Sequence, residues 1–187
     1  MALLVQKFGG TSVASVERIQ AVAKRICRCR DEGNDLVIVV SAMGHTTDQL
    51  TGLARAISTN PPQREMDMLL ATGEQVSIAL LAMALHALGV PAVSMTGPQV
   101  GILTESAHGR ARILEVRTDR LRRLLDDGHV VVVAGFALVA FTAMPGQWAG
   151  VGLGCVLMGS SVFVFDSFAQ HHASEYAAWL QQLPAAP

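Results

Sequence analysis

The chain has 187 residues, a formal net charge of −1, and a composition that is 51% hydrophobic and 5% aromatic. This length is enough for one domain with a hydrophobic core, and the near-neutral charge argues against a nucleic-acid-binding surface. Three cysteines give no disulfide framework, and the N-terminus carries no charged-then-apolar leader pattern, so we expect a cytoplasmic protein.

The first segments in chain order form a pattern that is typical of anion binding. Residues 2–8 predict a buried strand, and residues 15–30 predict a helix because apolar side chains recur every three or four positions. Between them lies "KFGGTS", in which Lys7 precedes Gly9 and Gly10. The lysine of the common P-loop follows its glycines, so this turn is of another kind. A strand, a glycine turn and a helix N-terminus can bind an anion, but an ordinary strand-to-helix turn explains the same residues.

The following segments alternate between strand and helix patterns. The run at residues 36–41 is continuously apolar, which is typical of a strand buried on both faces in a parallel sheet. Further strands are predicted at residues 91–95, 111–116 and 129–136. Helices are predicted from residues 46–48 to Ile57, at 64–88 with an interruption near Thr72 and Gly73, and at 118–127 with Gly128 closing the last one. This order predicts an α/β sandwich with a largely parallel sheet, in which residues 96–110 form a loop.

The composition changes towards the C-terminal end of the chain. From Gly128 to Phe165 there is no Asp, Glu, Lys or Arg. A transmembrane helix needs about 20 consecutive apolar residues, and neither apolar piece of this segment reaches that length, so we expect no membrane insertion. Residues 167–183 predict an amphipathic helix, on which His171, His172 and Glu175 are better explained as a solvated face than as metal ligands.

Several short stretches, taken together, resemble aspartate kinase, a member of the amino-acid kinase family. They are "KFGGTS", "SAMGHTTDQL", "REMDMLLATGEQVS", "SMTGPQVGI" and "VVVAGF", and they extend from about Leu4 to Phe136. The resemblance implies a three-layer α/β sandwich of the carbamate kinase-like type. It also implies transfer of the γ-phosphoryl group of ATP, bound to Mg²⁺, to the side-chain carboxylate of L-aspartate. That reaction yields 4-phospho-L-aspartate and ADP and begins lysine, threonine and methionine biosynthesis.

The resemblance implies a role for particular residues in these stretches. Lys7 is expected to act in catalysis by contacting the transferring phosphoryl group. The ATP phosphates are expected at Lys7, Gly9, Gly10, Thr11, Ser12 and Ser41, and aspartate is expected at Thr47, Asp48 and Glu74. The carboxylate of Glu74 would bind the α-ammonium group, and no residue is assigned as a metal ligand. Two structural alternatives remain: Asp48 as a helix cap, and Glu74 as an acid stabilised by the dipole at a helix N-terminus.

The sequence departs from the family pattern after Phe136. Residues 137–139 read Ala-Leu-Val where aspartate kinases have Gln-Gly, and no "GRGGSD"-like run follows. We therefore expect residues 1–136 to be the N-terminal part of an amino-acid kinase domain, and residues 137–187 to be a tail without a family match. A truncated or frameshifted product with little activity fits this pattern. A sheet that ends after "VVVAGF" would leave an apolar strand edge, which the tail segment "SVFVF" is able to cover.

Four functions remain open at this point. The first is an aspartate kinase segment, with aspartate and ATP as its small-molecule partners and an oligomeric state that the sequence does not reveal. The second is an inactive fragment that binds aspartate or phosphate weakly. The third is another amino-acid kinase, against which "KFGGTS" and "TGE" argue. The fourth, a small membrane protein, rests on the charge-free segment alone.

Overall fold

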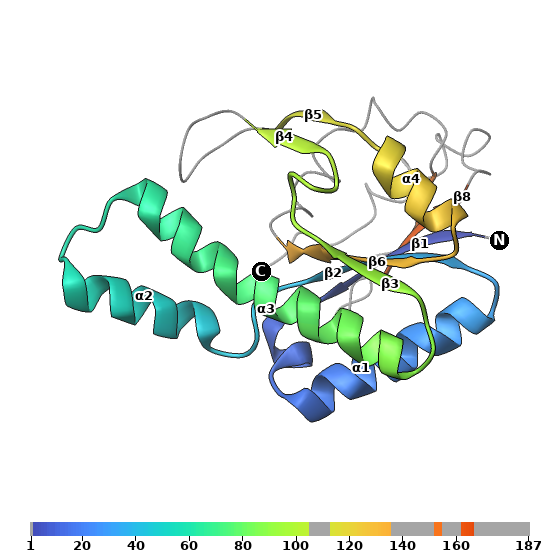
Figure 1. The fold of residues 1–187 in the computed structure, drawn as a ribbon, viewed down its shortest axis with the longest axis horizontal. Coiled ribbons are helices and arrows are strands. Elements are labelled where there is room, and N and C mark those ends of the chain that lie inside the picture. Colours follow the sequence, from blue (N-terminus) through green and yellow to red (C-terminus); the bar gives the residue numbers. More distant parts are fainter. Residues whose placement is uncertain (1, 105–112, 136–151, 155–161, 167–187) are drawn as a thin grey trace, which may run out of the picture.

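The computed structural model describes residues 2–104, 113–135, 152–154 and 162–166. The predicted helix at 167–183, with His171, His172 and Glu175, lies outside the described residues, as does most of the segment after Phe136. Within the described residues the chain forms an α/β sandwich, as the sequence predicts (Figure 1).

The central sheet has six strands in the order β3-β6-β2-β1-β8-β7. The strands are β1 (Leu3–Phe8), β2 (Asp35–Val40), β3 (Ala92–Met95), β6 (Val130–Ala134), β7 (Gly152–Gly154) and β8 (Val162–Asp166). The pairs β1–β2, β2–β6 and β3–β6 are parallel, whereas β8 pairs antiparallel with the outer edge of β1, and β7 pairs antiparallel with β8. The prediction of a largely parallel sheet is therefore confirmed.

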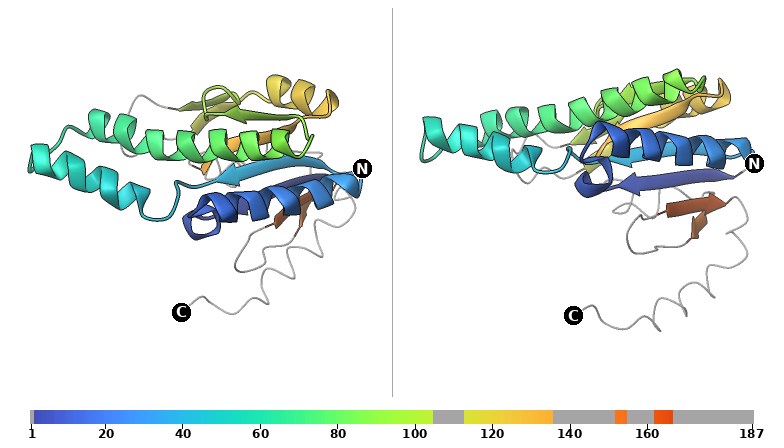
Figure 2. Two further views of the ribbon diagram at one scale, coloured as in Figure 1. Left: turned by 60° about the horizontal axis from the view of Figure 1, so that its bottom comes forward. Right: turned by 90° about the horizontal axis from the view of Figure 1, so that it is seen from below.

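Helices cover both faces of this sheet. They are η1 (Gly10–Val13, a 3₁₀ turn), α1 (Val16–Asp31), α2 (Thr46–Ile57), α3 (Gln63–Ala87) and α4 (Asp119–Asp126). Helices α1 and α3 lie on one face, while α4 and a separate hairpin of β4 (Ile102–Thr104) and β5 (Ile113–Val116) lie on the other (Figure 1). Helix α2 pairs with the first half of α3, and this pair extends beyond the sheet (Figure 2).

Alternation along the strands divides the core into two layers. Leu36, Ile38 and Val40 of β2 pack with α1 and α3, whereas Val37 and Val39 pack with the layer that contains Leu121 and Leu125 of α4. Successive side chains of a strand point to opposite faces, so an unbroken apolar run is what two covered faces require. This arrangement explains the continuous apolar runs of β2 and β6 and confirms the three-layer prediction.

Three details differ from the sequence-based expectations. The segment 96–110 is not all loop, because Ile102–Thr104 forms β4 and pairs with β5. The predicted interruption near Thr72 and Gly73 is wrong, because α3 is one continuous helix. Strand β6 is also not an edge, since it lies between β3 and β2; the segment Val162–Asp166 covers the edge of β1 instead.

Helix α3 is the one helix of the described residues that is long and apolar enough to cross a membrane by length and composition alone. Its buried residues include Ile78, Leu81 and Leu85, which belong to the core cluster shared with α1 and the sheet. It also buries Glu74 near its middle. These contacts are those of a core helix, which passes the same length and composition test.

Candidate active site at the carboxyl edge of the sheet

The candidate site residues follow parallel strands that end at the same edge of the sheet. Phe8, Val40 and Ala134 are the last residues of β1, β2 and β6, and they lie opposite one another in register. In open α/β sheets, ligands bind outside the carboxyl ends of the strands. The segments that follow β1 and β2 carry most of the residues predicted from the sequence.

The turn after β1 contains the predicted phosphate-binding residues. Lys7 is half-buried near the end of β1, and Gly9 precedes η1, which includes Gly10, Thr11 and Ser12. The backbone N–H of Ser12 donates to Gly9 O at 2.9 Å. The first N–H groups of any helical turn lack partners within that turn, so they can donate to an anion. A 3₁₀ turn thus stands between strand and helix, where the sequence predicted only a glycine turn.

Helix α1 begins two residues after this turn and fixes its position. Ser15 is the N-cap, and its hydroxyl accepts a hydrogen bond from the Arg18 backbone N–H at 3.4 Å. The guanidinium of Arg18 donates to Thr11 O at 2.5 Å and so ties α1 to η1. A hydrogen bond from the Ser15 side chain lowers the pKa of Glu17 below its ordinary value.

The turns after β1 and β2 are in direct contact. Gly10 O accepts a hydrogen bond from the Gly44 backbone N–H at 3.0 Å, and the Ser41 N–H donates to Phe8 O at 3.1 Å. A Cβ atom on Gly10 would lie 2.7 Å from Ala42 O, closer than real Cβ contacts, so only glycine fits there. A Cβ on Gly9 would meet no atom within 4 Å. The close contact therefore concerns Gly10, while Gly9 faces open space.

Glu74 reaches the same edge of the sheet from α3. Its side chain is buried, and its Oε1 atom would lie 3.0 Å from a Cβ added to Gly135, the residue after β6. The same Cβ would lie 2.9 Å from Val40 O and 3.3 Å from the Cα of Ser41. The carboxylate of Glu74 is therefore close to the ends of β2 and β6. Because α3 runs without interruption from Gln63, Glu74 lies near its middle, and the helix N-terminus alternative for this residue is wrong.

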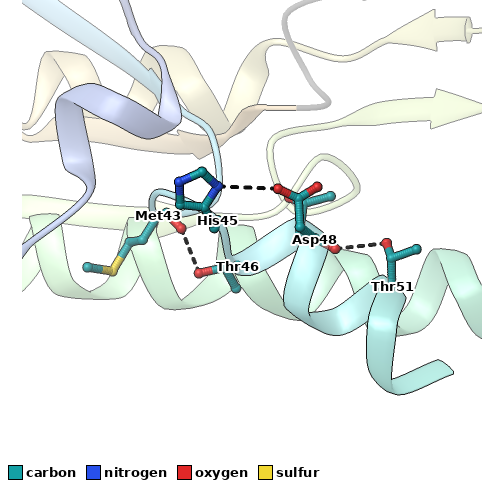
Figure 3. Close-up of polar contacts among 6 residues, drawn as sticks. Met43, His45, Thr46, Asp48 and Thr51 are labelled. Carbon is teal, nitrogen blue, oxygen red and sulfur yellow. Dashed lines mark hydrogen bonds and ion pairs between the residues drawn. The ribbon is translucent and has the colours of Figure 1, made fainter. Parts of the chain in front are cut away.

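The start of α2 forms an exposed rim beside this cluster (Figure 3). Thr47 and Asp48 are both exposed in its first turn. The Asp48 carboxylate lies 3.3 Å from Nδ1 of His45, and the Thr51 hydroxyl donates to Thr47 O at 2.8 Å. His45 rather than Asp48 occupies the N-cap position, so the helix-cap alternative for Asp48 is wrong.

Glycine also brings the rim and Glu74 together. A Cβ on Gly73 would lie 3.1 Å from Cγ2 of Thr46 and 3.2 Å from the Cβ of Ala42. The turn of α3 that carries Glu74 thus packs closely against the first residue of α2. The structure brings the η1 turn, Ser41 and Glu74 together at one edge of the sheet. Thr47 and Asp48 lie at the start of α2 and are exposed to solvent.

A family profile and the sequences of known proteins identify the family of this chain. The amino acid kinase family profile matches residues 2–151. The chain belongs to the amino acid kinase family. It is 62% identical over 142 residues to an aspartokinase of Geobacillus stearothermophilus, and the aligned residues cover 76% of this chain and 35% of that protein. It is 60% identical over 136 residues to the aspartate kinase Ask_LysC of Stutzerimonas stutzeri, covering 73% of this chain and 33% of that protein. The chain thus spans about a third of the length of these relatives.

Solved structures show that this amino acid kinase has the fold of its family. Aspartate kinase from Synechocystis matches with a TM-score of 0.62 and 61% identity, over 72% of this chain and 22% of that one. Aspartokinase III of E. coli in complex with aspartate and ADP matches with a TM-score of 0.60 at 21% identity, over 73% of this chain and 41% of that one. The second likeness supports the fold alone. Together they confirm the amino-acid kinase fold predicted from the sequence.

Sequence reasoning missed three residues that shape the edge of this amino acid kinase. The sequence predicts Arg18 only as part of a helix. Its contact with Thr11 depends on how the turn folds, and no sequence pattern indicates it. Gly73 resembles a helix interruption in the sequence, although a glycine inside an apolar helix can also indicate close packing. Gly135 follows a buried valine run in "VVVAGF", and a glycine directly after a strand can indicate close approach of other groups.

The described residues include groups of the kind that bind phosphate. Among them there is no group of three His, Cys, Asp or Glu side chains arranged to hold a metal. Lys7 and the N–H groups of η1 are phosphate-binding groups, and Mg²⁺ commonly keeps most of its contacts with phosphate oxygens and water.

Proposed function

We propose that the described residues form the N-terminal part of an aspartate kinase site, which transfers the γ-phosphoryl group of ATP to the side-chain carboxylate of L-aspartate. The observation that carries the proposal is the gathering of oppositely charged groups at one sheet edge. Lys7 lies two residues after the buried Val5 along β1, so both side chains belong to the face that α4 covers. Glu74 comes from α3, on the other face. The identity of about 60% to aspartokinases supports the choice of substrate.

Each group has a role that follows from its chemistry. The ammonium of Lys7 stabilises negative charge on the transferring phosphoryl group, and the backbone N–H groups of Gly9, Gly10 and Thr11, with the hydroxyls of Thr11 and Ser12, bind phosphate oxygens. The Glu74 carboxylate binds the α-ammonium of aspartate, with Thr47 and Asp48 contacting the same substrate. Ser41, at the end of β2, contacts the phosphates of ATP. Magnesium, when bound to the nucleotide, neutralises part of the phosphate charge.

The transfer itself asks little covalent chemistry of the protein. A side-chain carboxylate oxygen of aspartate forms a bond to the γ-phosphorus while the bond to the β,γ-bridging oxygen breaks, and ADP leaves with the electron pair. The protein's part is to hold both substrates in line and to neutralise charge. Lys7 and Glu74 would serve these two purposes from opposite faces of the sheet.

The 187-residue polypeptide is expected to be a poor enzyme when assayed by itself. Two observations support this expectation: it spans about a third of the length of its aspartokinase relatives, and no charged residue occurs from Gly128 to Phe165. Phosphoryl transfer needs more charged groups than Lys7 alone supplies. We therefore expect full catalytic activity only when these residues are part of a longer polypeptide. The role that we propose for them is in cytoplasmic amino-acid biosynthesis, with ATP and aspartate as substrates.

A chimera tests the proposal. Residues 2–135 of this chain would replace the matching segment of the Geobacillus stearothermophilus aspartokinase, and aspartate-dependent ADP release would be measured with ATP and magnesium. The chimera should turn over at about 1 per second or faster, as typical enzymes do, while the 187-residue chain should stay well below that rate. A folded chimera without aspartate-dependent turnover would refute the proposal.

The second candidate is a module that binds aspartate or phosphate without transferring anything. The observation in its favour is that the η1 turn and Glu74 are both present in a chain that matches only a third of its relatives. Calorimetric titration of the 187-residue chain with aspartate and with Mg-ATP separates the cases. Binding of both ligands combined with an inactive chimera would favour the binding module.

A further inference from the structure

Gly135 occupies a crowded position at the carboxyl edge of the sheet. Its backbone lies outside the left-handed region, so its conformation does not require glycine. The requirement is for space, because a Cβ atom there would lie 2.9 Å from Val40 O and 3.0 Å from Oε1 of Glu74. Real Cβ atoms seldom come closer than about 3.4 Å to other heavy atoms, so any side chain at this position displaces a neighbour.

We propose that Gly135 is a positioning residue for Glu74, and that its missing side chain provides the space in which the Glu74 carboxylate lies at the ends of β2 and β6. The two crowded neighbours differ in freedom. Val40 O belongs to a central strand paired on both sides, whereas the Glu74 carboxylate ends a side chain with three rotatable bonds. The carboxylate is therefore the neighbour that can yield most readily when position 135 gains a side chain, while the contacts with the backbone of Val40 and Ser41 remain.

The consequence for binding rests on the proposed function of Glu74. If its carboxylate binds the α-ammonium of aspartate, a displaced carboxylate weakens aspartate binding and leaves the phosphate turn around Gly10 intact. Gly135→Ala should raise the dissociation constant of aspartate about tenfold or more, a factor that corresponds to about 1.4 kcal/mol. The affinity for Mg-ATP should fall by less than the affinity for aspartate, because Lys7 and η1 lie at the end of β1 and only Ser41 of the ATP-binding residues lies close to position 135.

A double-mutant cycle with Gly135→Ala and Glu74→Asp tests the contact itself. Aspartate at position 74 retracts the carboxylate by one methylene group and so makes room for the new Cβ atom. In thermal unfolding of the 187-residue chain, Gly135→Ala should lower the midpoint, and adding Glu74→Asp should recover the part of the loss that comes from the contact with the carboxylate. In calorimetric titration with L-aspartate, the double variant should bind no more weakly than Glu74→Asp alone.

The outcomes separate the contact from the function. Additive losses of unfolding temperature, or a double variant that fails to fold along with Gly135→Ala, would attribute the crowding to Val40 O and overturn the proposal. If Gly135→Ala fails to fold and the double variant folds, the contact with Glu74 is supported. If the unmodified chain does not bind aspartate, its proposed function fails, yet the unfolding cycle still decides the role of Gly135.

Gly52→Ala provides the matched control. Gly52 lies within α2, and a Cβ there would meet no atom within 4 Å. This substitution makes the same chemical change without the crowding, and alanine favours a helix over glycine. Gly52→Ala should leave the affinity for aspartate unchanged and should keep or raise the unfolding temperature. Its effect on the unfolding temperature should add to that of Glu74→Asp without coupling.

Discussion

Glycine serves different purposes at the two edges of the central sheet. At the amino edge, Gly33, Gly89 and Gly128 come shortly after α1, α3 and α4, and their φ angles are 85°, 77° and 77°. A Cβ on Gly33 or Gly89 would meet nothing within 4 Å. At the carboxyl edge, Gly10 and Gly135 lack a left-handed φ, but added Cβ atoms would lie 2.7 Å and 2.9 Å from backbone oxygens. Gly33 and Gly89 at the amino edge are needed for their conformation, whereas Gly10 and Gly135 at the carboxyl edge are needed for their small size. Gly44, in the turn after β2, adds a left-handed φ of 47° near the carboxyl edge.

The difference separates the demands of folding from those of function. Left-handed glycines after helices end the helix and turn the chain into the next strand, as in many α/β proteins. Space-limited glycines appear where the turns after β1 and β2 and the Glu74 carboxylate are compressed together. Close approach of backbone and acidic groups is what a site for small charged ligands requires. The carboxyl edge is therefore where substitution should affect chemistry most.

The largest expected effect concerns Lys7. In the active chimera, Lys7→Ala should lower the turnover number about 10²–10³-fold, because a charge that stabilises the transition state is lost. The Michaelis constant for aspartate should change much less. The matched control at the amino edge is Arg30→Ala, whose guanidinium donates to Gly128 O at 3.2 Å and should leave turnover unchanged. If Lys7→Ala and Arg30→Ala lowered turnover equally, the carboxyl edge would not be the catalytic edge of the sheet.

The next effect concerns Gly10. Gly10→Ala should lower the free energy of unfolding by about 1–3 kcal/mol, the usual range for overpacking, because the new methyl group meets Ala42 O. Gly10→Asn should be at least as damaging, since a larger side chain worsens the crowding. Urea unfolding of both variants measures the two values. An asparagine variant that is more stable than the alanine variant would show that conformation, and not space, selects glycine here.

Glu74→Gln should affect aspartate binding by a smaller amount. It keeps the shape of the side chain and removes the charge, so the dissociation constant of aspartate should rise about tenfold, within the range expected for a lost charged hydrogen bond. Mg-ATP binding should stay within about twofold. Calorimetric titration with each ligand measures both quantities. A variant that changes only its unfolding temperature would assign Glu74 a structural role.

The smallest effect on ligand binding is expected at Gly33. Gly33→Ala should cost about 1–2 kcal/mol of unfolding free energy, because φ is 85° and a Cβ disfavours that conformation. Gly33→Asn should cost less than Gly33→Ala, since asparagine tolerates left-handed conformations. The order of alanine and asparagine is therefore reversed between Gly33 and Gly10, and aspartate affinity should not change in either Gly33 variant.

Local patterns were enough to predict most of the fold. The apolar runs that became β2 and β6 and the spacing of apolar residues in α1 are properties of neighbouring residues, and they predicted these elements correctly. The errors arose where distant contacts decide. Gly73 looks like a helix breaker in sequence, but its missing side chain makes room for Thr46 and Ala42. Strand β4 is short, and its pairing with β5 is what defines it.

The candidate site shows the same limit. The family resemblance named Lys7, Gly10 and Glu74, and the structure adds how their segments meet. The hydrogen bond between Gly44 and Gly10 and the crowding at Gly135 join residues that are far apart in sequence. No periodic pattern encodes such contacts, because they depend on the order of strands in the sheet.

The pairing of β8 with β1 has a consequence for the synthesis of the chain. Leu3 lies opposite Phe165, so the first described strand is completed on its outer side by the last one. Ribosomes add about 5–20 residues per second, and the outer edge of β1 therefore waits on the order of ten seconds for its neighbour. During that interval β2 and α1 can already pack against β1, while its free backbone groups invite pairing with other nascent chains. Chaperones that bind extended segments would find their target at this strand, and only until residues 162–166 leave the ribosome.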